Sequence, residues 1–197
     1  MKKKIVLCIV LAGLIFSLAG CAEEAGQPEA GVQQENSAVS EEEFAGDGAW
    51  TILVYLCGTD LESGYGAATM DLGEMLDRDF GSQVRFVVQT GGCTQWQNEV
   101  IPEDAIARYE IINGDMQEIS RMEQANMAES ATLKDFVTFG VENYGNNKLG
   151  LIMWDHGGGS VAGVCLDENY GSDTLDLAEI QQALDGIPRK FNLIGYD

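Results

Sequence analysis

Apolar and polar positions from residue 50 onward follow two alternating patterns. Continuous apolar runs rich in β-branched residues are typical of strands that are buried on both faces of a sheet. Four such runs predict strands over residues 50–58, 84–92, 149–154 and 191–197. Between these runs, apolar positions at helical spacing predict helices over residues 66–80, 132–145 and 173–186.

Turn and capping signals refine this pattern. Asn113-Gly114 is a strong two-residue hairpin signal and predicts two antiparallel strands over residues 106–122. Thr132 and Asp135 have the spacing of a capping box that opens a helix. Residues 161–167 indicate a short extended segment. Strands that alternate with helices predict an α/β fold, in which helices flank a mostly parallel sheet and the hairpin is an insertion.

The final strand of the pattern ends at Asp197, the last residue. A strand of a parallel sheet is normally covered on both faces, and an exposed apolar edge strand invites aggregation. Either this run forms an edge strand, or the sequence stops before the domain is complete. We favour the second alternative and expect a fold that is incomplete at its C-terminus.

The first 49 residues have a different character. Residues 1–20 combine a basic start with an apolar run too short for a comfortable membrane span, which is the layout of a signal peptide. The run ends in Leu-Ala-Gly-Cys, which resembles the lipobox of bacterial lipoproteins, so Cys21 is the expected lipidation site. An ordinary secretory signal with a chance cysteine is the alternative. Residues 21–49 are acidic and predict a disordered linker, which leaves residues 50–197 as the folded part.

The charge of the chain restricts its partners. It has 32 Asp and Glu residues against 11 Lys and Arg residues, and a formal net charge of −21. Phosphate backbones would be repelled, so nucleic acid is not an expected partner, whereas cationic peptides would be attracted. Solubility alone is the alternative reason for this charge. The leader, the linker and the charge together predict an extracytoplasmic protein that is anchored by lipid to the bacterial cell membrane.

Cysteine chemistry adds little to this picture. Of the five cysteines, Cys57, Cys93 and Cys165 fall in the folded part. Their spacing suggests no metal site. We interpret each as a small buried apolar residue rather than a nucleophile, with a disulfide between Cys57 and Cys93 as an alternative.

One histidine stands out because the chain has no other. His156 follows the predicted strand 149–154 and precedes three glycines, while Asp197 ends the predicted strand 191–197. Ligands of parallel α/β sheets bind outside the carboxyl ends of the strands, so the two residues are expected to be neighbours at such a site. A structural histidine at a strand end beside a tight turn is the alternative interpretation.

Several ordered stretches resemble the clostripain family of cysteine peptidases. They are WTILVYLCGTDLES, LGLIMWDHGGGSVAGVCLDE, DTLDLAEIQQAL and FNLIGYD. The similarity runs over most of residues 50–197 as these ordered motifs. The resemblance implies the caspase-like α/β fold that this family shares with caspases. It also implies an endopeptidase whose partners are peptides or proteins with Arg or Lys at P1. The resemblance makes no cofactor certain, and it leaves open whether the protein binds calcium.

The resemblance assigns roles residue by residue. His156 matches the catalytic histidine, and the backbone N–H of Gly157 is expected to help form the oxyanion hole. Asp197 matches the Asp of an Asp-Ala-Cys segment and is expected to bind the cationic P1 side chain. The nucleophilic cysteine of that segment has no counterpart in this sequence, so the chain alone is expected to be inactive. The loop 166–173 has no Lys or Arg, which argues against self-cleavage within it.

Two other functions stay open at this point. The His-Gly-Gly-Gly stretch also occurs as an oxyanion segment in lipases and esterases. Residues 158–162 lack the last glycine of a nucleophile elbow, however, and a second histidine is missing. The second alternative is a non-catalytic surface lipoprotein, which acts as a binding module and keeps a peptidase-like sheet. The missing cysteine fits this alternative.

Overall fold

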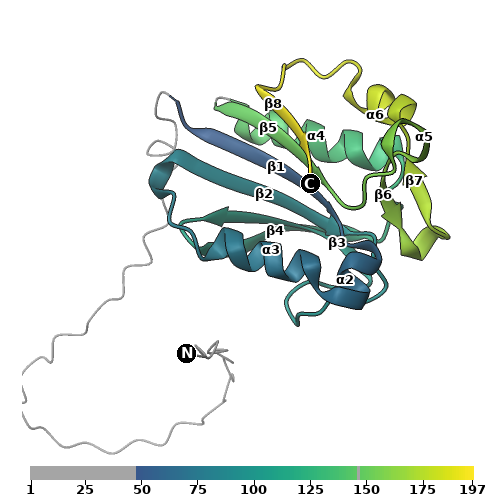
Figure 1. Cartoon of the computed structure of the whole chain (residues 1–197). Helices are drawn as coiled ribbons and strands as arrows, with labels where there is room; N and C mark the ends of the chain where they lie inside the picture. The colour runs from purple at the N-terminus through teal and green to yellow at the C-terminus, as the bar shows by residue number, and fades with distance from the viewer. Residues whose placement is uncertain (1–47, 146) are drawn as a thin grey trace, which may run out of the picture. The chain divides into compact units, whose positions relative to one another are not determined.

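The computed structural model describes residues 48–145 and 147–197 (Figure 1). Six strands form the central sheet: β1 (Trp50–Cys57), β2 (Val84–Gly91), β3 (Ala105–Ile112), β4 (Asp115–Glu123), β5 (Lys148–Trp154) and β8 (Leu193–Tyr196). Their order across the sheet is β4-β3-β2-β1-β5-β8. β2, β1, β5 and β8 run parallel, and β3 and β4 add an antiparallel hairpin at one edge. The predicted α/β class and the mostly parallel sheet are therefore confirmed.

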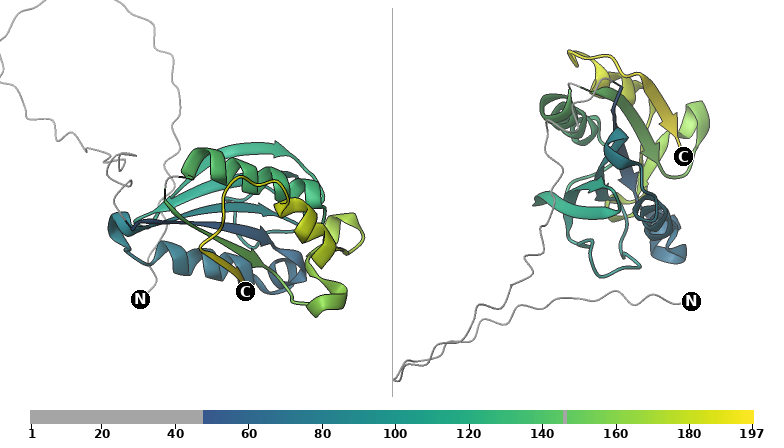
Figure 2. Two further views of the ribbon diagram at one scale, coloured as in Figure 1. Left: turned by 90° about the horizontal axis from the view of Figure 1, so that it is seen from above. Right: turned by 90° about the vertical axis from the view of Figure 1, so that its left-hand side faces the viewer.

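Helices cover both faces of this sheet (Figure 2). The main helices are α2 (Thr59–Tyr65), α3 (Ala67–Leu76), α4 (Ser130–Tyr144) and α6 (Leu177–Leu184). Successive side chains of a strand point to opposite faces, and β1 therefore contributes to two cores. Its residues Leu53 and Tyr55 pack with α4 and α6, whereas Val54 and Leu56 pack on the face that α3 covers.

Shorter elements lie between the main ones: η1 (Gly81–Gln83), α5 (Gly159–Ala162), β6 (Val164–Asp167), η2 (Glu168–Tyr170) and β7 (Asp173–Leu175). β6 and β7 pair antiparallel in a separate two-stranded sheet. The extended segment predicted over residues 161–167 is thus confirmed in its second half, while α5 occupies the first residues.

The predicted hairpin is confirmed in its turn as well as its strands. Asn113 has φ +50° and Gly114 has φ +81°, the two left-handed conformations that a type I′ turn requires. A Cβ atom at Gly114 would lie 2.7 Å from the carbonyl oxygen of Leu76, so only glycine fits there.

Two predicted helices differ from the structure. The helix expected over residues 66–80 is α3 and is shorter, because it ends at Leu76; a separate helix, α2, precedes it and ends at Gly66, where φ is +68°. Sequence reasoning missed α2 because its seven residues are too few to show an apolar period. The capping box expected at Thr132 is also wrong: α4 begins at Ser130, and Asp135 forms an ion pair with the buried guanidinium of Arg108.

A capping box does open the last helix. The backbone N–H of Glu179 donates to the Asp176 carboxylate at 2.8 Å, and the Glu179 carboxylate accepts from the N–H of Asp176 at 2.9 Å. The helix predicted over residues 173–186 is therefore shorter than expected, because the residues before Asp176 form β7.

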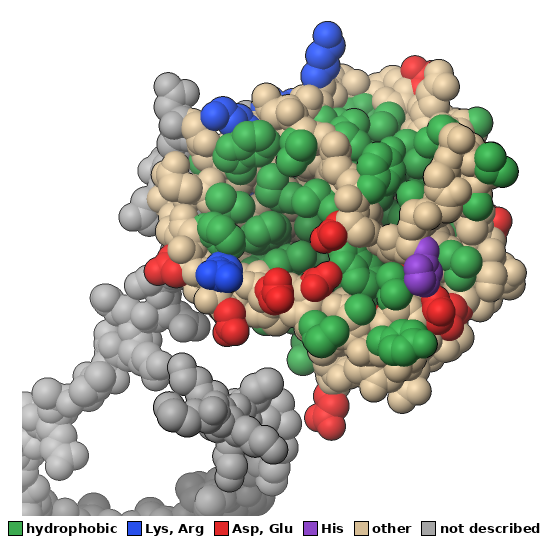
Figure 3. Space-filling model, in the orientation of Figure 1, with side chains coloured by type: hydrophobic (Ala, Val, Ile, Leu, Met, Phe, Trp, Pro, Cys, Tyr) green, Lys and Arg blue, Asp and Glu red, His purple; other side chains and the backbone are tan. Residues whose placement is uncertain are grey.

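The prediction that the last strand is buried is wrong for this chain. β8 is an edge strand that pairs only with β5, and within the described residues no helix covers its outer face. Leu193 is 46% exposed and Ile194 is 44% exposed. Figure 3 shows apolar side chains gathered on this face of the sheet.

Among the described residues, no helix is long and apolar enough to cross a bilayer. The predicted signal peptide over residues 1–20, the lipidation site at Cys21 and the linker up to residue 47 lie outside the described residues.

Candidate active site

Three parallel neighbours, β1, β5 and β8, end at the same edge of the sheet. Backbone hydrogen bonds continue past the last two of these strands. The N–H of Asp155 donates to the carbonyl oxygen of Asp197 at 3.1 Å, and the N–H of Asp197 donates to the carbonyl oxygen of Met153 at 3.1 Å. His156 and Asp197 therefore follow two adjacent strand ends, which agrees with the proximity expected from the sequence.

His156 lies at the surface, with 48% of its side chain exposed, and its ring contacts a carboxylate from another strand end. Its Nε2 atom lies 2.8 Å from Oδ1 of Asp60, the second residue of α2. The hydroxyl of Thr59 donates to the same carboxylate oxygen at 2.9 Å. The hydrogen bonds from His156 and then Thr59 lower the pKa of the Asp60 carboxyl. Figure 3 shows the histidine beside acidic side chains on the surface.

The carboxylate of Asp155 is buried directly beneath this histidine. One of its oxygens accepts a hydrogen bond from the N–H of His156 at 2.5 Å, and the other accepts from the N–H of Leu166 at 2.5 Å. Burial raises the pKa of Asp155 to about 6, although both backbone hydrogen bonds act in the opposite direction. Asp155 thus ties the end of β5 to β6 and fixes the backbone of His156.

The positions of the glycines after His156 differ in how strictly the structure requires glycine there. A Cβ atom at Gly163, where φ is +71°, would lie 2.1 Å from the carbonyl oxygen of Leu175. A Cβ atom at Gly158 would lie 2.5 Å from the Cβ atom of Ala162. At Gly157 a Cβ atom would meet nothing within 4 Å. The N–H of Gly157 also donates to no acceptor among the described residues. The fold therefore requires the later glycines, while Gly157 presents an available N–H donor.

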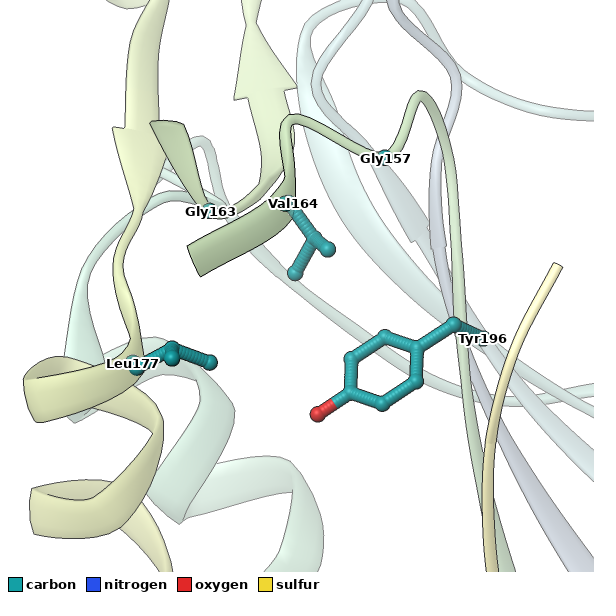
Figure 4. A pocket seen from close by; sticks show the side chains of 6 residues that line it. Gly157, Gly163, Val164, Leu177 and Tyr196 are labelled. Carbon is teal, nitrogen blue, oxygen red and sulfur yellow. The ribbon is translucent and has the colours of Figure 1, made fainter. Parts of the chain in front are cut away.

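An apolar pocket of about 250 Å³ opens beside this glycine loop (Figure 4). Its lining residues are Gly157, Gly159, Gly163, Val164, Leu177 and Tyr196. The ring of Tyr196 extends from the end of β8 toward the first turn of α6, where Leu177 lies. The end of β8 therefore carries an aromatic wall for this pocket and, one residue later, the carboxylate of Asp197.

The carboxylate of Asp197 is exposed. It accepts no hydrogen bond from the described residues, whereas the backbone of the same residue is held by both of its hydrogen bonds to the β5 end. The charge is thus positioned by its backbone and available to a ligand.

The three cysteines of the folded part are buried and free. Burial and a hydrogen bond with the thiol of Cys165 raise the pKa of Cys57 well above its ordinary value. Burial, with the charge of Glu62 next in size, raises the pKa of Cys93 to about 12. The interpretation as small buried residues is confirmed, and the alternative disulfide between Cys57 and Cys93 is not formed.

In the part of the chain that the structure describes, no three or more His, Cys, Asp or Glu side chains are grouped to hold a metal ion. The sequence left a calcium requirement open, and residues 48–145 and 147–197 contain no such group of ligands for that ion.

The sequence profile of the clostripain family matches residues 54–197. The chain belongs to the clostripain family. This membership leaves no support for the lipase or esterase alternative. No curated protein sequence matches the chain.

Solved structures of C11 cysteine proteases share the fold. A secreted C11 protease from Bacteroides thetaiotaomicron with an irreversible peptide inhibitor has a TM-score of 0.56 at 19% identity, over 76% of this chain and 42% of that one. Iotapain from the same organism has a TM-score of 0.58 at 12% identity, over 77% of this chain and 46% of that one. An inactive zymogen of a C11 protease from Parabacteroides distasonis has a TM-score of 0.52 at 20% identity, over 77% of this chain and 42% of that one.

These identities show the fold alone, and they confirm the caspase-like α/β architecture that the resemblance to the clostripain family implied. The chain spans less than half the length of each of these neighbours.

Sequence reasoning missed three polar residues of this clostripain-family site: Thr59, Asp60 and Asp155. Asp60 carried a usable signal, because it follows the carboxyl end of a predicted parallel strand within the stretch WTILVYLCGTDLES. Asp155 precedes His156 directly, but the sequence does not show that its side chain turns inward to bind backbone N–H groups.

Proposed function

We propose that this chain is the N-terminal part of a cysteine endopeptidase that cleaves after Arg or Lys. Membership of the clostripain family supports this class of reaction. The observation that carries the proposal is the position of His156 at the carboxyl ends of parallel strands. It is exposed there and precedes the available N–H of Gly157, and the adjacent strand end carries Asp197, whose carboxylate is available.

The proposed nucleophile is a cysteine that follows Asp197 by two positions in the natural protein, with an alanine between them. His156 takes the proton of that thiol, and the thiolate attacks the carbonyl carbon of the scissile bond. The C–N bond then breaks, and His156 returns the proton to the leaving amine. Water hydrolyses the resulting thioester, which releases the carboxylic acid and restores the thiol.

Two further groups assist this reaction in the proposal. The N–H of Gly157 donates to the oxyanion that forms when the thiolate adds to the carbonyl group. The carboxylate of Asp197 binds the guanidinium or ammonium group of the P1 side chain through charge-assisted hydrogen bonds. The availability of both groups among the described residues supports these roles.

The proposed location is the outer side of the bacterial cell membrane, with a lipid anchor at Cys21. The basic and apolar leader, the Leu-Ala-Gly-Cys sequence and the formal net charge of −21 support it. Two of the similar solved structures are described as a secreted C11 protease from Bacteroides thetaiotaomicron, which agrees with a site of action outside the cytoplasm.

The natural gene and its product test this function. We expect the reading frame to continue with Ala-Cys after Asp197, and the complete protein to release a fluorophore from peptides with Arg or Lys at P1. The 197-residue chain should release none. A stop codon after Asp197 would contradict the proposal and leave a non-catalytic surface lipoprotein, a binding module with a peptidase-like fold, as the function.

A further inference from the structure

Asp60 is the only described residue whose side chain hydrogen-bonds to the ring of His156. Its Oδ1 atom lies 2.8 Å from Nε2 of His156, although 96 positions separate the two residues. The contact joins the first turn of α2, after β1, to the turn after β5. Both groups are exposed, at 60% for the Asp60 side chain and 48% for that of His156. Substrate could therefore reach the ring while this contact persists.

The residue that holds Asp60 is strained. Thr59 is fully buried and has φ +45°, a conformation that is a genuine outlier for a β-branched residue. Glycine would adopt this conformation without penalty. A threonine at this position supplies a hydroxyl that donates to Asp60 at 2.9 Å and accepts the N–H of Leu61 at 3.2 Å. Strain of this kind concentrates at functional sites, and here it accompanies a side chain that fixes the carboxylate.

The contact determines where the ring proton lies. An ionised carboxylate only accepts hydrogen bonds, so the ring nitrogen that faces Asp60 must carry the proton. The pKa of Asp60 is lowered by the bonds from His156 and Thr59, which keeps this carboxylate ionised at neutral pH. In the neutral ring, Nδ1 is then the nitrogen with a free lone pair, and only this nitrogen can accept a proton.

We propose that Asp60 is a positioning residue, which holds His156 with its proton on Nε2 and leaves Nδ1 to take the thiol proton. Thr59 holds Asp60 in place through its hydroxyl. This inference rests on the proposed peptidase function, which it deepens by fixing the tautomer of the general base. Neither residue touches the reacting atoms in this arrangement.

A different role for Asp60 predicts a different result. An exposed carboxylate at this edge of the sheet could instead bind a cationic substrate side chain, as proposed for Asp197. Loss of Asp60 would then raise KM selectively for Arg and Lys substrates. A positioning role lowers kcat on every substrate and leaves KM nearly unchanged.

The first test is independent of activity, because His156 is the only histidine. In the 197-residue chain with ¹⁵N in histidine alone, correlation of ring protons with ring nitrogens reports the tautomer directly. We expect the wild type to show a single tautomer with the proton on Nε2. Asp60→Ala should give averaged nitrogen signals from both tautomers. Averaged signals in the wild type, or unchanged signals in Asp60→Ala, would overturn the proposal.

The second test uses the complete natural protein. Asp60→Ala should lower kcat by roughly 10- to 100-fold, and Asp60→Asn, which keeps an acceptor without charge, should lie between that variant and the wild type. Thr59→Val removes the hydroxyl at constant shape and should lower kcat, while Thr59→Ser should retain it. Glu74→Gln is the control, because it removes a charge at an exposed position of α3 outside the site.

Two kinetic outcomes would overturn the positioning role: an unchanged kcat in Asp60→Ala, or a change confined to KM for cationic substrates. Failure of the proposed function looks different. In that case the complete wild-type protein turns over no peptide, while the ring nitrogens of the 197-residue chain still report whether Asp60 selects the tautomer.

Discussion

Asp155 and Leu166 close the loop that carries the glycines, through a hydrogen bond of 2.5 Å from the backbone N–H of Leu166 to the Asp155 carboxylate. The other carboxylate oxygen of Asp155 accepts from the N–H of His156. One buried side chain therefore fixes both the backbone of the proposed general base and the far end of its loop.

This arrangement predicts a pH effect on stability. The pKa of Asp155 is raised to about 6 by burial, so the folded state binds this proton more tightly than the unfolded state does. The contribution of Asp155 to the free energy of unfolding is therefore largest at acid pH and is lost as the pH rises through about 6. Relative to Asp155→Asn, the wild type should lose about 1 kcal/mol between about pH 5 and about pH 7.5.

Chemical denaturation of both chains at the two pH values measures this difference. Other carboxylates titrate alike in the two chains, so their effects cancel when the free energies of unfolding are subtracted. A difference that grows in favour of the wild type as the pH rises would show that the pKa of Asp155 is lowered by folding rather than raised.

The glycine loop predicts unequal effects of added methyl groups. Gly163→Ala should lower the free energy of unfolding by about 1–3 kcal/mol or more, because its backbone is left-handed and the new Cβ would meet the carbonyl of Leu175 at 2.1 Å. Gly157→Ala should leave stability within about 0.5 kcal/mol, because its Cβ meets nothing within 4 Å. Urea denaturation of the two variants compares them, and equal losses would contradict the open space described at Gly157.

Asp197 should control substrate choice. In the complete protein, Asp197→Asn removes a charge-assisted contact worth about 1.5–3 kcal/mol, which corresponds to roughly ten- to over a hundredfold in kcat/KM. The loss should be confined to substrates with Arg or Lys at P1, measured against a matched peptide with an uncharged P1 residue. A residue that only capped the strand end would depress activity on both peptides alike and lower thermal stability. Retained preference for Arg would rule out the P1 role.

The lipid anchor has its own test. Cells that express the chain and are fed a fatty-acid probe should label it, and Cys21→Ala should abolish the label. Cys93→Ala is the matched control, because it removes a buried thiol of the folded part and should keep the label. Label that persists in Cys21→Ala would contradict lipidation at Cys21.

The sequence was sufficient for the sheet and for the strand ends that hold His156 and Asp197. Apolar runs mark parallel strands because such strands are buried on both faces, and β1, β2 and β5 fit this description. β8 has the same composition but lies at an edge in this chain. The amino-acid composition of a strand indicates that it favours burial. It does not indicate whether a neighbouring strand or helix is present to bury it.

The side-chain contacts of the site were beyond sequence reasoning. Asp135 matches a capping box by spacing, yet the buried guanidinium of Arg108 takes its carboxylate. A local pattern along α4 does not show that a charged partner lies nearby on a strand that is distant in the sequence. The same holds for Asp60, whose partner His156 is 96 positions away. Contacts of this kind depend on which strand ends the topology brings together.

In the proposed mechanism, His156 acts as the general base of a cysteine peptidase. The most direct measurement is the turnover of an Arg peptide by the complete natural protein and by its His156→Ala variant, with the free energy of unfolding measured for both. We expect a loss of roughly 10²- to 10⁴-fold in kcat with little change in stability, because the ring is exposed and, among the described side chains, hydrogen-bonds only to Asp60. Turnover that survives in His156→Ala would contradict it.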